Sequence, residues 1–326
     1  MTLNLNRRQF TVATALLPLA PVLRAQENYP TRPITLVVPF SAGSVVDLQA
    51  RVIARVLAAR LGQPIVVDNK VGVSGSIGAE FVSRAAPDGY TLLLGTQGTQ
   101  GTNSALYKTI RYDPVKDFVA VHGLSGNPHV LVVNPKLGIG SVAELVELAK
   151  KNPGKMNFGS GGNGTGGHLC LELLQTRTGA RFTHVPYKAT SAALVDLVSG
   201  NVDAMFDFLQ TAAPHIRSGK LRALAVTRGQ RMPMLPEVPT MAEAGFPGVE
   251  SLSWGGFFAP AKTPEHIVKR LSSETSETLR SQEIKGTLES AGGFVIDMPH
   301  PEFQAYVARE AVKWTDVLRT AGVTLE

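Results

Sequence analysis

The chain has 326 residues, of which 44% are hydrophobic and 18% are charged, and its formal net charge at pH 7 is +6. This length accommodates two domains with separate cores, and the composition is that of a globular protein rather than a disordered or fibrous one. The lysines and arginines form no stripe and are not interleaved with aromatic residues, so we expect no nucleic-acid partner. The single cysteine, Cys170, excludes a disulfide within the chain and a cysteine-rich metal site.

The N-terminal segment has the layout of a secretory signal. Arg7 and Arg8 precede a short apolar stretch, residues 11–23, and Ala25 is the small residue at the expected cleavage point. The adjacent arginines, followed by Phe10, resemble the twin-arginine export signal. Export by this route places the mature protein in the periplasm. An uncleaved apolar start that anchors the chain is the alternative interpretation.

After this segment, short apolar runs alternate with helical patterns. The expected strands cover residues 34–38, 65–67 and 90–95, and the helices between them cover residues 47–61 and 78–86. The strand runs are almost wholly apolar, as in a parallel sheet that is covered on both faces. Gly62 follows the first helix as a stop signal. This alternation predicts a parallel sheet with crossover helices.

The same alternation begins again in the second third of the chain. Ser141 and Glu144 form a capping-box pattern at the start of a helix. The remaining patterns predict further strands and helices, which are strands 129–133, 183–186, 202–206 and 222–226 and helices 141–152, 165–178 and 192–199. We therefore predict two α/β units, each with a Gly-rich turn from strand to helix near its start.

The last third of the chain determines how the two units are connected. A strand-like run covers residues 253–260, and two helices follow over residues 264–280 and 301–318, with residues 291–296 between them. If these helices pack back on the first unit, the chain crosses between the units twice and forms a hinge. The predicted division is a signal peptide over residues 1–25, a first lobe over residues 26–124 and 254–326, and a second lobe over residues 125–253.

Two strand-to-helix turns carry the strongest signal for a binding site. One covers residues 40–47 and the other, which is rich in glycine, covers residues 159–168. In open α/β sheets, ligands bind at the carboxyl ends of the strands. A helix start there offers unpaired N–H groups and a partial positive charge, which accept an anion without a lysine or arginine. Two such turns across a cleft would hold the two carboxylates of a small diacid.

Enzymatic and cofactor-binding alternatives lack their defining features. Gly159, Gly161 and Gly164 match the dinucleotide pattern G-x-G-x-x-G, but no acidic residue follows the next strand to hold a ribose. No G-x-S-x-G nucleophile elbow is present, and the histidines have no metal-binding spacing. We therefore expect no catalytic residue, no metal and no cofactor.

Several single residues have two interpretations. Asp47 either stabilises its helix start and loop or contacts the ligand, and His168 either hydrogen-bonds within the Gly-rich turn or contacts the ligand. Asp207, at the end of a strand, would meet an amino or hydroxyl group, and Trp254 either stacks on the ligand or closes the hinge core. The candidate ligand-binding residues share positions at strand ends, in the turns that follow them or at the rim of the cleft. They are Phe40, Ser41, Gly43, Ser44, Asp47, Thr96, Gln97, Ser160, Gly164, Thr165, His168, Tyr187, Thr190 and Asp207.

An ordered series of motifs carries a resemblance to a known family. The motifs cover residues 29–34, 38–43 with Asp47, 77–80, 86–92, 112–118, 184–188, 202–207 and 236–240. Over essentially the whole mature chain, they resemble the solute receptors of tripartite tricarboxylate transporters, also called the Bordetella uptake gene products. The resemblance implies a type II periplasmic-binding-protein fold, with two α/β lobes that close on a ligand in the cleft between them.

The same resemblance implies a receptor rather than an enzyme, and we expect the chain to be a monomer. Its ligands would be di- or tricarboxylates, acidic amino acids or aromatic acids, and its partners would be inner-membrane transporter subunits. Two alternative hypotheses are a sensor subunit, whose partner would be a sensor kinase, and an exported enzyme. Ser44, Val45 and Val46 depart from the family pattern, which has a second glycine and then small or polar residues there. This departure favours an apolar or aromatic carboxylate over citrate and leaves the ligand's identity open.

Overall fold

The structure is a computed structural model that describes residues 29–290 and 292–325, and the expected signal peptide lies outside these residues. The described strands are β1 (Ile34–Val38), β2 (Ile65–Asn69), β3 (Thr91–Thr96), β4 (Phe118–Val133), β5 (Asn157–Ser160), β6 (Thr183–Pro186), β7 (Ala204–Phe208), β8 (Arg222–Val226), β9 (Leu252–Pro260) and β10 (Phe294–Pro299). The helices are α1 (Val45–Leu61), α2 (Ser76–Ser83), α3 (Asn103–Leu106), α4 (Val142–Lys151), α5 (Gly166–Thr178), α6 (Thr190–Ser199), α7 (Leu209–Arg217), α8 (Glu265–Leu279), α9 (Gln282–Ser290) and α10 (Glu302–Ala321). Short helical turns complete the set, namely η1 (Val73–Gly75), η2 (Gly98–Thr102) and η3 (Pro135–Leu137).

The first lobe is built around the parallel strands β2, β1 and β3, which continue into the antiparallel strands β9 and β4. Buried side chains of α1, α8 and α9 form a core on one face of this sheet, and side chains of α2 and α10 form a core on the other. Covering on both faces explains why β1 is almost wholly apolar, since side chains on both of its sides are removed from water.

The second lobe has its own core beneath the far half of β4. Strands β7 and β8 pair antiparallel with β4, and β5 and β6 extend the sheet in parallel. Helices α4 to α7 contribute buried apolar side chains to this core. The two predicted α/β units and their order along the chain are therefore present.

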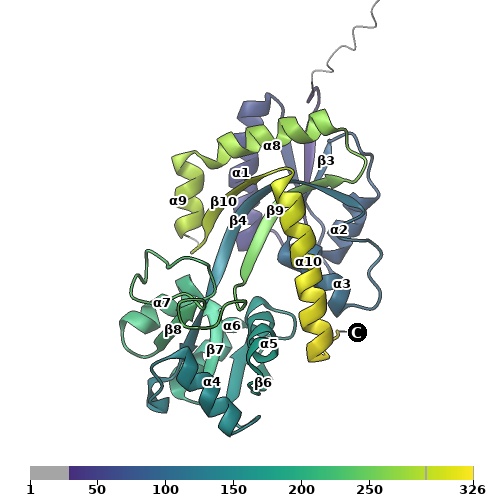
Figure 1. Cartoon of the computed structure of the whole chain (residues 1–326). Coiled ribbons are helices and arrows are strands. Elements are labelled where there is room, and N and C mark those ends of the chain that lie inside the picture. The colour runs from purple at the N-terminus through teal and green to yellow at the C-terminus, as the bar shows by residue number, and fades with distance from the viewer. Residues whose placement is uncertain (1–28, 291, 326) are drawn as a thin grey trace, which may run out of the picture.

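Strands β4 and β9 lie side by side and run from one lobe into the other (Figure 1). The sequence predicted only residues 129–133 as a strand, whereas β4 begins at Phe118. The part that was missed contains Gly123 and Gly126, and closely spaced glycines in a sequence usually indicate a turn. Both are required by packing, because a Cβ on Gly123 would lie 2.9 Å from the Phe303 ring and one on Gly126 would lie 3.0 Å from the Phe294 ring.

Helix α10 packs against both lobes and is seen beside the crossing strands in Figure 1. Its first turns bury Phe303 and Val307 in the core of the first lobe. Its later turns bury Trp314 and Leu318 with the core of the second lobe. The prediction that this helix packs back on the first lobe is therefore incomplete, because its C-terminal half also touches the second.

The predicted helix ends agree closely with the structure. Ser44 caps α1 and Gly62 ends it in the left-handed conformation, as its sequence position predicted. Ser141 caps α4, but the Glu144 carboxylate accepts from Gly140 N–H rather than from Ser141 N–H as in a standard capping box. Helices α3, α7 and α9 were not predicted. None of the helices in the described part of the chain is long and apolar enough to cross a membrane.

Candidate functional site

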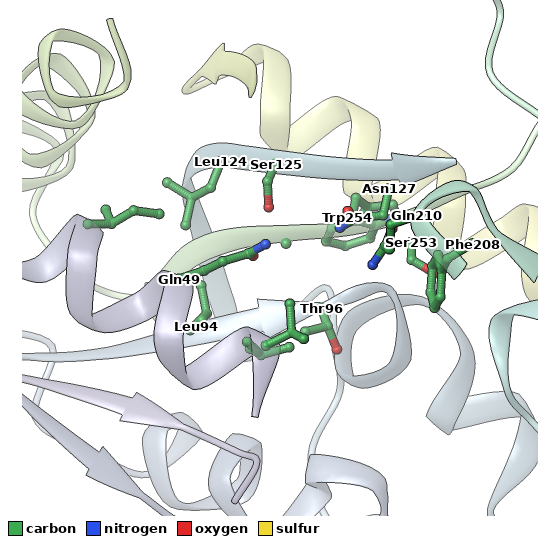
Figure 2. Close-up of a pocket in the computed structure, with 14 residues that line it drawn as sticks. Gln49, Leu94, Thr96, Leu124, Ser125, Asn127, Phe208, Gln210, Ser253 and Trp254 are labelled. Carbon is green, nitrogen blue, oxygen red and sulfur yellow. The ribbon is translucent and has the colours of Figure 1, made fainter. Parts of the chain in front are cut away.

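Two adjoining cavities lie between the lobes, beside the segment where the paired strands β4 and β9 pass from one lobe to the other. We call the first the loop chamber; it measures about 390 Å³ and is bordered by the start of α5, the end of β3 and η2. We call the second the apolar chamber; it measures about 250 Å³ and is shown in Figure 2. The two share the lining residues Val46, Thr96, Phe208, Ser253 and Trp254, so they lie side by side in the cleft between the lobes.

The start of α5 faces the loop chamber. Gly164, Thr165 and Gly166 line this cavity. Thr165 is the N-cap residue, yet its hydroxyl donates to Gly162 O at 2.7 Å and no side chain of the described residues caps the helix. The first-turn N–H groups of Gly166 and Gly167 have no partner within the helix, and they carry its partial positive charge. This turn therefore offers an anion a set of free donors.

Buried side chains hold the Gly-rich turn in place. Gly164 N–H donates to His168 Nδ1 at 3.0 Å, and the His168 ring stacks on His184 with centroids 4.0 Å apart. The Ser160 hydroxyl lies 2.6 Å from His184 Nε2 and accepts from Gly162 N–H. Burial and the neighbouring His168 lower the pKa of His184 to about 4, so this ring is neutral at pH 7. Ser160 and His168 lie behind the turn and line neither chamber.

The start of α1 is held in a similar way by Asp47, which is 1% exposed. Its carboxylate accepts from Gly43 N–H at 2.9 Å, from Arg51 Nε–H at 2.9 Å and from Asn69 Nδ2–H at 2.8 Å. The Ser44 hydroxyl caps the helix by accepting from Asp47 N–H. These four hydrogen bonds tie the turn to α1 and to the end of β2, so the geometry favours the loop-stabilising interpretation of Asp47 over direct ligand contact.

This arrangement predicts an acid-dependent loss of stability. The hydrogen bond from Arg51, with those from Asn69 and Gly43, lowers the pKa of Asp47 to about 2. Since the folded pKa is below the unfolded value of about 4, the contribution is complete above pH 4 and is lost as the pH falls towards 2. We expect Asp47→Asn to destabilise the protein in urea unfolding at pH 6 and to have a smaller effect at pH 3. An equal effect at both values would contradict this role.

The structure brings five of the fourteen candidate residues to the wall of the loop chamber, namely Phe40, Thr96, Gln97, Gly164 and Thr165. Gln97 is 4% exposed, and its side-chain nitrogen has no partner among the described residues. An unpaired buried donor in a cleft wall is the arrangement expected of a group that meets a ligand.

Nine candidate residues do not line either chamber, namely Ser41, Gly43, Ser44, Asp47, Ser160, His168, Tyr187, Thr190 and Asp207. The Tyr187 hydroxyl donates to Asp196 at 2.6 Å. Asp207 accepts from Phe208 N–H at 2.8 Å and from the Thr211 hydroxyl at 2.7 Å, and burial raises the pKa of its carboxyl. The Tyr187 and Asp207 side chains therefore have hydrogen-bond partners within the second lobe.

Sequence reasoning missed three of the five residues that the two chambers share, namely Val46, Phe208 and Ser253. Val46 was noted only as a departure from a pattern, and Phe208 and Ser253 carried no motif. Trp254 is 2% exposed, donates from Nε1 to Glu310 at 3.3 Å and packs against Phe303, yet it also lines both chambers. Trp254 therefore belongs to the core at the hinge, as one of its two interpretations predicted, and one part of it also borders the cleft.

The cleft wall carries no formal charge. Within the described part of the chain, no Lys, Arg, His, Asp or Glu side chain lines either chamber. His129 stacks on Phe208 with centroids 4.5 Å apart, and burial lowers its pKa to about 4, so it supplies no positive charge at pH 7. The described residues also contain no group of three side chains that could hold a metal ion. An anion here would depend on hydrogen-bond donors and helix dipoles.

Comparisons with known proteins agree with this picture. A profile of the tripartite tricarboxylate transporter family receptor matches residues 49–323. The chain belongs to this family. It is 40% identical over 292 residues to a UPF0065 protein from the tcbD-tcbE intergenic region of Pseudomonas sp. (strain P51), covering 89% of this chain and 87% of that one. It is 37% identical to Protein BugT of Bordetella pertussis, over 94% of each chain.

Solved structures of family members share the fold. A TctC solute-binding protein from Polaromonas superposes with a TM-score of 0.82 at 28% identity, covering 90% of this chain and 99% of that one. The structure of R. palustris Rpa4515 with adipate superposes with a TM-score of 0.73 at 39% sequence identity. The structure of the periplasmic binding protein BugD superposes with a TM-score of 0.70 at 35% identity. Each match covers 91% of this chain and 100% of the other chain. The predicted family and two-lobed solute-binding fold are confirmed. Members are substrate-binding receptors, so this chain is a receptor and not an enzyme.

Proposed function

We propose that this chain is a periplasmic receptor that captures a small carboxylate between its lobes and presents it to the inner-membrane subunits of a tripartite tricarboxylate transporter. The observation that carries the proposal is the uncapped start of α5 in a cleft wall without formal charge. Two relatives support the ligand class, since one solved structure contains adipate and another, MatC of Rhodopseudomonas palustris at 35% identity and a TM-score of 0.69, contains malate.

The carboxylate would accept hydrogen bonds from Gly166 and Gly167 N–H on the second lobe. On the first lobe, Thr96 and Gln97 would meet the same ligand from the end of β3. Hydrogen bonds to a charged group contribute about 1.5–3 kcal/mol each. Donors on both lobes are satisfied together only when the cleft is closed, so the ligand stabilises the closed state.

The candidate residues then divide into two roles. Those in the wall of the loop chamber would contact the ligand, and Ser160, His168 and Asp47 would hold the two turns in shape. The lobe boundaries at residues 124/125 and 253/254 fall within β4 and β9, where the two crossing strands would bend. Export by the twin-arginine route rests on Arg7 and Arg8 of the sequence.

Binding to a panel of carboxylates tests the proposal. Thermal shift followed by calorimetry should find one saturable site per chain, with the ligand recovered chemically unchanged. At about one hundred times its dissociation constant, the ligand should add about 2.7 kcal/mol to the free energy of unfolding. The absence of binding across mono-, di- and tricarboxylates, acidic amino acids and aromatic acids would refute the receptor function.

The Gln97→Leu substitution separates ligand contact from folding. Because the Gln97 side-chain nitrogen has no partner in the cleft wall, its loss should leave the unliganded protein as stable as before or more so. Carboxylate affinity should fall about tenfold, which corresponds to one hydrogen bond to a charged group. Gln282→Leu, on the exposed surface of α9, is the matched control and should change neither quantity. Unchanged affinity in Gln97→Leu would remove this residue from the site.

A further inference from the structure

The apolar chamber has a different chemistry from the loop chamber that it adjoins. Its wall is formed by both lobes (Figure 2). Half of its fourteen lining residues are apolar, namely Val45, Val46, Ile53, Leu94, Leu124, Phe208 and Trp254, and the others are uncharged polar residues and one glycine. Water bound against such a surface is readily displaced by an apolar group of matching shape. The chamber therefore fits the hydrocarbon body of a ligand rather than a second charged end.

A second carboxylate would find no compensating charge in this chamber. The part of the chain that the structure describes places no cationic side chain on its wall. Helix α7 also begins here, since Gln210 of its first turn lines the cavity. No side chain caps that helix, but the Asp207 carboxyl lies directly before its start and accepts from Phe208 N–H and the Thr211 hydroxyl, so an acidic group already lies at the positive end of the helix. A second ionised carboxylate would lose its hydration with no cationic side chain to replace it and with the acidic Asp207 close by, which opposes its entry.

Two side-chain atoms in the wall have no partner among the described residues, namely the donor Gln49 Nε2 and the acceptor Gln210 Oε1. Gln49 of α1 is 9% exposed, and its side-chain nitrogen has no hydrogen-bond partner among the described residues. Figure 2 shows its carboxamide reaching from α1 into the chamber. Buried donors are almost always paired in native proteins, and leaving one unpaired is unfavourable. An uncharged oxygen at the far end of a ligand would satisfy this donor without bringing a charge.

We propose that the cleft selects a monocarboxylate with an elongated apolar or aromatic body and an uncharged oxygen, such as a hydroxyl or carbonyl, at its far end. The carboxylate lies at the start of α5, the body fills the apolar chamber, and the far oxygen accepts from Gln49. This inference rests on the proposed receptor function and adds the class of ligand. It excludes citrate-like acids as the preferred ligands.

Calorimetry on the purified chain with butanoate, hexanoate, 6-hydroxyhexanoate and adipate tests the inference. Each methylene that enters the apolar chamber should tighten binding about fourfold. The hydroxyl at the far end should tighten it about fivefold over hexanoate, as one neutral hydrogen bond would. Adipate, of the same length but with a second carboxylate, should bind at least tenfold more weakly than 6-hydroxyhexanoate.

The Gln49→Leu variant tests the contact at the far end. The fivefold preference for 6-hydroxyhexanoate over hexanoate should fall to about one, whereas Gln282→Leu should retain it. A preference that persists in Gln49→Leu overturns the assignment of Gln49. Tighter binding of adipate or citrate than of 6-hydroxyhexanoate overturns the ligand class but leaves the receptor function standing. If none of these acids binds and the wider carboxylate panel also fails, the receptor function itself is wrong.

Discussion

Replacing Gly166 with alanine should weaken carboxylate binding about a hundredfold, which corresponds to about 2.7 kcal/mol. Gly166 is the first residue of α5, and a Cβ there would lie 2.5 Å from His129 Nε2 and 3.0 Å from the Ser253 hydroxyl. His129 cannot yield easily, because it is 2% exposed and stacks on Phe208. The helix start must therefore shift, and the N–H groups that hold the carboxylate shift with it.

The control for this substitution is Gly286→Ala in α9. A Cβ at Gly286 would meet no atom within 4 Å. Alanine should stabilise this helix by about 0.5–1 kcal/mol and leave binding unchanged. Overpacking at Gly166 should destabilise the protein by about 1–3 kcal/mol, which urea unfolding measures separately. Binding within threefold of the parent protein in Gly166→Ala would show that the start of α5 does not hold the ligand.

Replacing Glu310 with alanine should destabilise the protein by about 3 kcal/mol or more. Glu310 is 7% exposed, and one of its carboxylate oxygens accepts from Trp254 Nε1–H at 3.3 Å and from Trp314 Nε1–H at 3.0 Å. Its removal leaves two buried indole N–H groups unpaired, at about 1–3 kcal/mol each. The Lys313 ammonium still donates to the Glu250 carbonyl oxygen in this variant, so the loss of its contact with Glu310 adds little to the destabilisation.

This substitution also reports on the cleft, because Trp254 belongs to its wall. Glu310→Gln retains an acceptor and should lose less than half as much stability. Glu237→Ala, at an exposed position, should stay within about 0.5 kcal/mol of the parent protein. Urea unfolding measures all three. A loss below about 1 kcal/mol in Glu310→Ala would mean that the two indoles find other acceptors.

The sequence predicted the alternation of strands and helices well, because buried parallel strands and capped helices leave local signals. Gly62 marked the C-terminal end of α1, whereas the predicted start at residue 47 lies two residues after the observed start at Val45. The first part of β4 was missed because Gly123 and Gly126 have the local composition of a turn, and only their contacts with distant aromatic rings explain them. Helix α7 contains Pro214, which reads as a break in a helical pattern.

The sequence predicted which turns border the cleft, but it did not predict which side chains of those turns point into it. Residues such as Thr165 and Ser160 belong to one Gly-rich segment, yet one lines the cleft and the other lies behind it. Their direction depends on partners far along the chain, such as His184 for Ser160. The apolar chamber could not be predicted from the sequence for the same reason. Its lining residues, such as Gln49, Phe208 and Trp254, are far apart in the chain and come together only in the folded structure.

A crystal structure of the chain with a bound carboxylate, chosen from the binding panel, tests the central claim most directly. We expect the lobes to be closed, with the carboxylate oxygens within 2.7–3.2 Å of Gly166 or Gly167 N–H. No lysine, arginine or histidine side chain should contact the carboxylate. A ligand whose carboxylate pairs with a basic side chain, or lies away from the start of α5, would contradict the account.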